Sequence, residues 1–384
     1  MPITKELKRV IDLFEKGLGF SLFVDKQYWF DPYDYGYIGY AKRETNSVTS
    51  GLNALEYAFT ESWGDKLISL DLLLAIHQKV TENVNPQPIL SDQLRYKGKD
   101  DGEVNHIKQG IRKSPVYFQL NVFVPTEKVD LIVDLEAIQC NKAKMIFSKT
   151  EEFEQALSVA ASHEAHNQLC RKFYNGTQEY KMKYALMLSN GFYYVIPALT
   201  ENDLLENLDK LIKAYNTKIL LCQNDDQRLE LIFETVKNIE LTHPFYDANL
   251  RTSIILLQRL LVQNGFMPTA FIDPNKLDNL PIKVLINQYD GQNGYAALDR
   301  LLTRDDQPFT TSDIQNVYLD QFKLDDNEVD QIGRQIKSYN DRSEQITLNI
   351  KNTHNHKQSD NPKSCFIEAE PKGDITATSS VSFG

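Results

Sequence analysis

The feature that most constrains the fold of this chain is a pair of apolar, helix-periodic segments separated by a short polar cluster. The second segment, residues 249–264, is apolar over nearly its whole length, and Gly265 follows it as a stop signal. Pro244 and Phe245 interrupt the helical pattern between the two segments. In the first segment, 226–242, core-type residues recur at helical spacing, namely Leu229, Ile232, Phe233, Val236 and Ile239. The sequence therefore predicts two consecutive core helices joined by a polar loop.

The polar cluster in that loop holds His243, Asp247, Asn249 and Arg251 within nine residues. A helix that begins near Asn249 points its free N–H groups, around residues 248–251, at an anion in front of it. Arg251 can fork across phosphate oxygens, and Asn249 can donate to another. Asp247 is a hard oxygen ligand suited to one Mg²⁺ ion, and His243 can accept a proton from an attacking hydroxyl. The cluster predicts a site that holds a diphosphate and activates a nucleophile.

This segment, HPFYDANLR, resembles the signature of the Fic family, His-Pro-Phe-x-(Asp/Glu)-Gly-Asn-Gly-Arg-x-x-Arg. The surrounding pattern over residues 180–290, a hairpin followed by helices, is similar as well, and 69–83 is a candidate for an earlier core helix. The resemblance implies a mainly all-α fold, in which a β-hairpin flap covers a helical core. The matching positions are His243, Pro244, Phe245, Asp247, Asn249 and Arg251.

The resemblance also implies an activity, the transfer of a phosphate-containing group to a protein Ser, Thr or Tyr hydroxyl. The transferred group in this family is usually AMP from ATP. His243 would then be the general base, Asp247 the Mg²⁺ ligand, and Asn249 and Arg251 the phosphate-binding side chains, with the backbone of Ala248 and Leu250 beside them. An inactive Fic-like binding module is the alternative of a different class, and the presence of both His243 and Asp247 argues against it.

Three departures from the signature bear on the donor. Ala248 replaces the first glycine, which we expect to be a mild change, and Leu250 replaces the second, which is tolerable in a helix and costly at positive φ. Ile254 replaces the second arginine, which in the family grips the γ-phosphate of ATP. ATP would lose a charge-assisted contact of about 1.5–3 kcal/mol, whereas a two-phosphate donor would lose nothing. Arg259 lies on a different helical face and is no substitute.

We therefore expect ATP as the donor, and a CDP-linked alcohol is the alternative. Family frequency favours ATP, and Ile254 favours a CDP-linked alcohol, because some bacterial Fic effectors with a similar pattern transfer phosphocholine from CDP-choline to host small GTPases. In many family members an inhibitory glutamate contacts the second arginine. The nearest candidate here is Glu56, whose neighbours do not match the inhibitory motif. We expect Glu56 to be an ordinary exposed helix residue without an inhibitory role.

Two segments are candidates for the flap. Residues 181–197 (KMKYALMLSNGFYYVIP) carry the stronger hairpin pattern, two β-prone arms around Ser189-Asn190-Gly191. Residues 112–125 are the rival, and the segment that is not the flap would belong to an insertion used for target recognition. We expect helices to begin near Thr4 and after the N-cap Ser69. The predicted organisation is an N-terminal helical and aromatic segment (1–66), a Fic core (67–300) with an insertion within 84–180, a C-terminal helical lobe (301–351) and a disordered tail (352–384).

Composition bounds the partners. The net charge of −11 argues against nucleic acid or an anionic membrane as the main partner, and no apolar run reaches the ~20 residues that a membrane span needs. Four scattered cysteines fit a reducing intracellular environment. His163 and His166 lack a third metal ligand. The tail segment FIEAEP, followed by small hydroxyl residues, is similar to C-terminal signals of bacterial type IV effectors, which would place the protein in a host cytosol.

Overall fold

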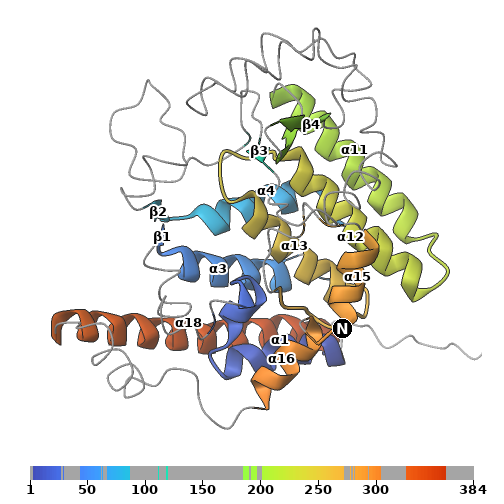
Figure 1. Ribbon diagram of the computed structural model, residues 1–384. Coiled ribbons are helices and arrows are strands. Elements are labelled where there is room, and N and C mark those ends of the chain that lie inside the picture. The colour runs from blue at the N-terminus through green and yellow to red at the C-terminus, as the bar shows by residue number, and fades with distance from the viewer. Residues whose placement is uncertain are drawn as a thin grey trace, which may run out of the picture.

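The described part of the chain is mainly helical, which confirms the predicted fold class (Figure 1). No helix among the described residues is long and apolar enough to cross a membrane. The computed structural model describes residues 3–26, 29, 44–61, 63, 67–86, 111, 118–119, 185–189, 192–196, 201–271, 277, 280, 282–292, 294–303 and 326–359.

Helix α13 (Asn249–Gln263) is the centre of the molecule, and every residue from 251 to 262 is buried. It packs against α12 (Asp225–Thr242), α4 (Leu70–Thr81) and α3 (Ser47–Thr60), while α11 (Glu201–Ile219) packs on the outer side of α12. Burying a Leu or Ile side chain stabilises the fold by about 1.5–3 kcal/mol. The run IILLQRLL is therefore sufficient to fix this helix inside the bundle. The predicted helices on both sides of the polar loop are confirmed.

The helix ends follow the capping residues in the sequence. Thr4 Oγ1 accepts from the Leu7 N–H at the start of α1 (Lys5–Glu15), and Ser69 Oγ accepts from the Leu72 N–H at the start of α4, as predicted. Gly265 has a φ of 86° directly after α13, which confirms it as the stop. Asn216 on α11 holds both backbone groups of Ile68 and so fixes the chain that enters α4.

A small sheet lies at one end of the molecule. Strands β4 (Ala185–Ser189) and β5 (Phe192–Ile196) form the predicted antiparallel hairpin, and β3 (Phe118–Gln119) pairs with β5 to give the order β3-β5-β4. The two candidate flap segments thus contribute to one sheet. The sequence shows which segments have a β pattern but not which of them pair with each other. From the sequence alone, 181–197 and 112–125 are therefore alternatives.

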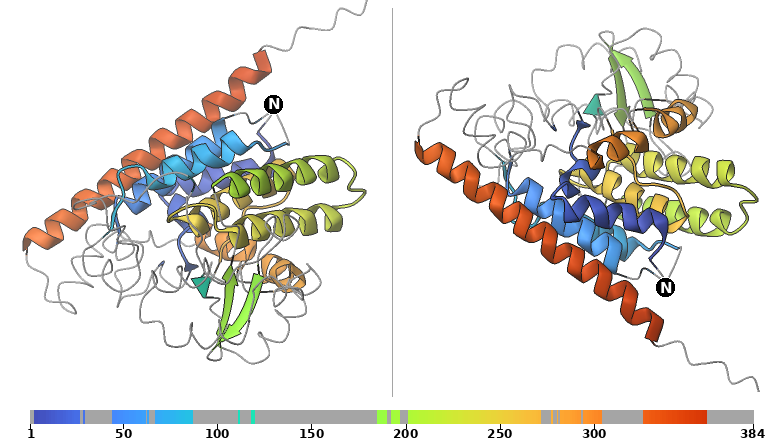
Figure 2. Two further views of the ribbon diagram at one scale, coloured as in Figure 1. Left: turned by 90° about the horizontal axis from the view of Figure 1, so that it is seen from above. Right: turned by 90° about the horizontal axis from the view of Figure 1, so that it is seen from below.

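The C-terminal part differs from the predicted separate lobe. Helix α18 (Asp326–Ser359) is one continuous helix that lies along α3 and α1, on the side opposite the β4–β5 hairpin (Figure 2). It extends eight residues past the predicted boundary at 351, so the tail cannot begin at 352. His354, which we expected in the tail, is buried and its Nε2 donates to the Phe59 carbonyl at 3.0 Å. Local polarity suggested disorder there, but α3 supplies a packing partner.

Several short elements complete the described fold. They are η1 (Gly19–Leu22), the pair β1 (Glu44–Thr45) and β2 (Asn85–Pro86), α15 (Ile282–Asp290) and α16 (Tyr295–Leu302). Helix α16 was not predicted. The predicted insertion lies almost entirely outside the described residues, as do the His163/His166 pair and the tail from 360 onward. The predicted domain division otherwise stays a prediction.

Candidate active site

His243 is placed at the junction between α12 and the loop that precedes α13. It is the C-cap of α12 and adopts φ 46° and ψ 59°, a left-handed conformation that a non-glycine residue seldom takes. Its side chain is 26% exposed, so the imidazole is accessible to a substrate. The left-handed residue turns the chain out of the helix, so that the loop begins at His243 itself.

Asn249 holds the loop closed. Its Oδ1 accepts from the Phe245 N–H at 2.8 Å, and its Nδ2 donates to the Phe245 carbonyl at 3.1 Å. The side chain is buried, so these two bonds satisfy polar groups that water does not reach. Asn249 is therefore a loop clamp in this structure. An amide carries a second N–H, so its predicted donation to a phosphate stays a prediction.

His77 on α4 contacts the loop through both its ring and a hydrogen bond. No role for this residue was predicted from the sequence. Its ring stacks on Phe245, with 3.7 Å between the ring centroids and 10° between the planes, and its Nε2 donates to the Asp247 carbonyl at 3.1 Å. Burial lowers the pKa of His77 to about 4, and nearby Arg251 acts in the same direction. The ring therefore stays neutral near pH 7. A single histidine in an apolar helix carries no sequence signal for such a contact.

Asp247 is half-buried in the same loop, next to the residues that Asn249 and His77 hold in place. Its Oδ1 accepts from the Ala248 N–H at 2.6 Å, which takes one of the backbone donors expected in the anion cradle. Among the described residues, no group of three or more His, Cys, Asp and Glu side chains could hold a metal ion. One carboxylate fits Mg²⁺, which commonly keeps several waters and takes its other ligands from substrate phosphates. The residues thus fit the ion, and Asp247 as its ligand stays a prediction.

The two replaced glycine positions differ from each other in backbone conformation, and only Ala248 departs from our expectation. Leu250 lies inside α13 with its side chain packed against the core, so the substitution there needs no positive φ. Ala248 instead has a φ of 58° and a ψ of 21°. A left-handed residue with a Cβ costs about 1–2 kcal/mol, so the change that we expected to be mild carries the backbone strain.

Three further residues on α13 have different surroundings. Arg251 is buried in the first turn, close enough to His77 to lower its pKa. Ile254 is only 1% exposed and belongs to the hydrophobic core, so that position presents no charge to a ligand. Arg259 is fully buried and donates to the carbonyls of Ala58 and Glu61, both at 2.7 Å. The prediction that Arg259 is no substitute for the missing arginine agrees with this geometry.

Glu240 is a second polar residue of the site that the sequence did not reveal. It lies one turn before His243 on α12, its side chain is 4% exposed, and its Oε1 is 4.0 Å from His243 Nδ1. Ser253 Oγ on α13 donates to its Oε2 at 2.8 Å. Burial raises the pKa of Glu240 to about 7, and the bond from Ser253 opposes that rise.

Glu56 does not have the environment that we expected. Its side chain is 17% exposed and forms an ion pair with Arg342 of α18, and Asn349 of the same helix donates to it. It is therefore a contact between α3 and α18 and not an ordinary exposed residue. Glu56 is engaged on the face of α3 that α18 covers, which supports the prediction that it has no inhibitory role.

The loop also touches the chain that leads into the rival flap segment. Ile111, which is buried, forms an isolated antiparallel bridge with Phe245. Phe118 of β3, seven positions further along the chain, pairs with the hairpin strand β5. The bridge at Ile111 therefore lies close in sequence to a strand of the sheet.

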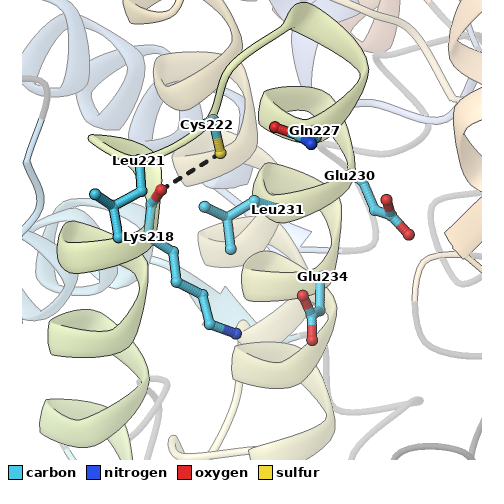
Figure 3. Close-up of a pocket in the computed structure, with 7 residues that line it drawn as sticks. All are labelled: Lys218, Leu221, Cys222, Gln227, Glu230, Leu231 and Glu234. Atoms are coloured by element: carbon cyan, nitrogen blue, oxygen red, sulfur yellow. Dashed lines mark hydrogen bonds between the residues drawn. The ribbon is translucent and has the colours of Figure 1, made fainter.

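A shallow pocket at the other end of α12 is separate from this loop. It lies at the turn between α11 and α12, and it is lined by Lys218, Leu221, Cys222, Gln227, Glu230, Leu231 and Glu234 (Figure 3). Glu230 precedes His243 by thirteen residues on the same helix, a separation of about 20 Å. The pocket therefore contributes nothing to the candidate site.

Comparison with known proteins agrees with the motif. Residues 156–261 match the model of the Fic/DOC family, and this range includes the whole 243–251 loop. The chain is 27% identical over 267 residues to the phosphocholine transferase AnkX of Legionella pneumophila subsp. pneumophila. That match covers 67% of this chain and 25% of AnkX, so the chain spans about a quarter of the length of this relative. Residues 156–261 of this chain are therefore identified as a Fic/DOC family domain.

Proposed function

We propose that this chain is a Fic-type transferase that moves phosphocholine from CDP-choline to a hydroxyl group of a protein. The observation that carries the choice of donor is Ile254, which is 1% exposed in the core at the position of the second signature arginine. The similarity to a phosphocholine transferase supports the same choice.

The donor argument is energetic. A third phosphate needs a cationic partner, and losing one charge-assisted hydrogen bond costs about 1.5–3 kcal/mol, or roughly 10- to 150-fold in affinity. Ile254 cannot supply that bond, and the guanidinium of Arg259 is committed to two carbonyls of α3. CDP-choline has only two phosphates and needs no such partner.

In the proposed reaction, the acceptor hydroxyl oxygen attacks the phosphorus that bears choline. A new P–O bond forms to the protein, the diphosphate P–O bond breaks, and CMP leaves with the bonding electron pair. His243 takes the hydroxyl proton, because its imidazole is accessible and lies at the mouth of the loop. The acceptor oxygen becomes a better nucleophile as it loses this proton.

The phosphates would be held by the start of α13. The N–H groups of its first turn have no partners within the helix, and Arg251 lies in that turn. Asn249 and His77 fix the loop in front of it through the backbone of Phe245 and Asp247. Mg²⁺, when held by Asp247, would supply positive charge to the diphosphate.

AMP transfer from ATP is the second candidate, and the six signature positions that are common to the family favour it. In that reaction the acceptor attacks the α-phosphate and pyrophosphate leaves. A host small GTPase as acceptor, and delivery into a host cell by type IV secretion, remain proposals of the same kind.

The experiment is a transfer assay with two donors. The purified protein is incubated with Mg²⁺, a panel of purified small GTPases, and either CDP-choline or ATP, and the acceptors are weighed by intact mass spectrometry. We expect a phosphocholine adduct and no AMP adduct. An AMP adduct alone would establish the second candidate, and no adduct from either donor, combined with no binding of either donor by calorimetry, would support the inactive module.

A further inference from the structure

We propose that Glu240 is a positioning residue for His243, and that Ser253 holds its carboxylate in place. This inference rests on the proposed function, because it assigns a partner to the histidine that acts as base there. Three residues on two successive helices would then form one relay, Ser253–Glu240–His243.

The geometry of the relay comes from the packing of α12 against α13. Glu240 lies in the last turn of α12, three residues before the C-cap His243, and its Oε1 is 4.0 Å from His243 Nδ1. Ser253 projects from α13 and donates to the other carboxylate oxygen at 2.8 Å. A distance of 4.0 Å is within the range of an ion pair. The carboxylate of Glu240 would therefore attract the imidazole of His243 once the imidazole is protonated.

The burial of Glu240 argues that this carboxyl group has more than a packing role. A charged carboxylate in the interior is costly unless it has a partner, and a single hydroxyl donor does not offset that cost. Residues around it on α12 are mostly apolar and buried, including Val236, Ile239 and Leu241. Its Oε1 lies 4.0 Å from His243 Nδ1, so the two side chains form an ion pair when the imidazole is protonated.

The relay also decides which ring nitrogen acts. A carboxylate beside Nδ1 favours the tautomer with its proton on Nδ1, and this leaves the lone pair of Nε2 for the acceptor hydroxyl. When Nε2 takes that proton, the imidazolium forms next to a carboxylate that stabilises it. A buried acid plays the same two parts beside the histidine of serine proteases. Glu240 itself would not touch the substrate.

The test uses Glu240→Gln and Ser253→Ala, with Glu234→Gln as the matched control. Glu234 undergoes the same change on the same helix but lies at the distant pocket. The first measurement is the ¹⁵N spectrum of the imidazole of His243 in the donor-free protein, which reports the tautomer without any activity. The second is the separate determination of kcat and KM for the donor.

We expect Glu240→Gln to shift His243 away from the Nδ1-protonated tautomer and to lower kcat about 10- to 100-fold, with KM nearly unchanged. Ser253→Ala should move both quantities in the same direction but less, and Glu234→Gln should move neither. If Glu240→Gln does not fold, Ser253→Ala provides the test.

The outcomes separate the two proposals. An unchanged tautomer in both relay variants overturns the role of Glu240, whatever the activity. A wild-type protein that transfers nothing overturns the proposed function, while the ¹⁵N spectra still decide the relay. A fall in kcat that is matched by Glu234→Gln would show a general effect on the helix and would also overturn the relay.

Discussion

The two ends of helix α13 carry similar residues that do different work. Both ends have a buried arginine, a side-chain amide and a residue with positive φ. At the N-terminal end, Asn249 clamps the 243–248 loop and Arg251 lies in the first turn behind it. At the C-terminal end, Gln258 and Arg259 bond to backbone groups of neighbouring elements.

These C-terminal contacts tie the bundle together. The amide of Gln258 donates to the carbonyls of Leu22 and Thr269 and accepts from the Thr269 N–H, so it joins η1 to the chain after α13. Arg259 caps the end of α3, and its guanidinium lies 5.7 Å from the centre of the Trp63 ring. A buried arginine therefore does not by itself indicate a ligand site. Its role depends on which acceptors the fold brings to it.

The largest expected effect is at the loop. His243→Ala should lower transfer by about 10³-fold or more, because it removes the proton acceptor, while the unfolding free energy changes by less than about 1 kcal/mol at this half-exposed position. The measurement is the initial rate of adduct formation, with thermal unfolding as the control for folding. Activity near the wild-type level would remove the histidine from the reaction.

The paired arginines test the comparison directly. Arg259→Met should lower the unfolding free energy by about 3 kcal/mol, because it leaves two buried carbonyls without a donor. Arg251→Met should lower the unfolding free energy less but reduce donor affinity about 10- to 100-fold. Urea unfolding and calorimetry with CDP-choline measure the two quantities. The same loss of stability and of affinity in both variants would break the distinction between the two ends.

The pH dependence of stability isolates Glu240. Its pKa is raised in the folded protein from 4.5 to about 7, so folding disfavours the carboxylate relative to the unfolded chain, and the charged form that the relay uses predominates above about pH 7. Its contribution to stability is fully present below pH 4.5 and is lost as pH rises through 7. The unfolding free energy of Glu240→Gln should therefore increase relative to that of the wild type between pH 5 and pH 8, by at most about 3 kcal/mol. Urea unfolding at the two pH values checks this, and Glu234→Gln should show no such gain.

The smallest effects concern Ala248 and Gly265, the residues of positive φ that flank α13. Ala248→Gly should raise the unfolding free energy by about 1 kcal/mol, because glycine adopts φ 58° without strain. Gly265→Ala should lower it by a similar amount, although a Cβ there would meet no atom within 4 Å. Thermal unfolding of both variants is the measurement. A destabilised Ala248→Gly would show that the alanine methyl packs usefully in the loop.

The sequence alone determined the local elements of this protein. Periodicity and caps are local properties of a few residues, so Thr4, Ser69 and Gly265 were predictable, as were the helices on both sides of the loop and the β4–β5 hairpin. The signature HPFYDANLR is equally local, and the resemblance to the Fic family rests on these contiguous residues.

Tertiary structure alone decided which distant groups meet. His77 reaches the loop across 170 residues of sequence, and Glu56 meets α18 across nearly 290. Nothing in their own segments marks these contacts, because burial and partners depend on how helices pack. Ala248 shows the same limit within the motif: which of the two replaced glycines carries positive φ depends on where α13 begins, and the packed helix places that start at Asn249.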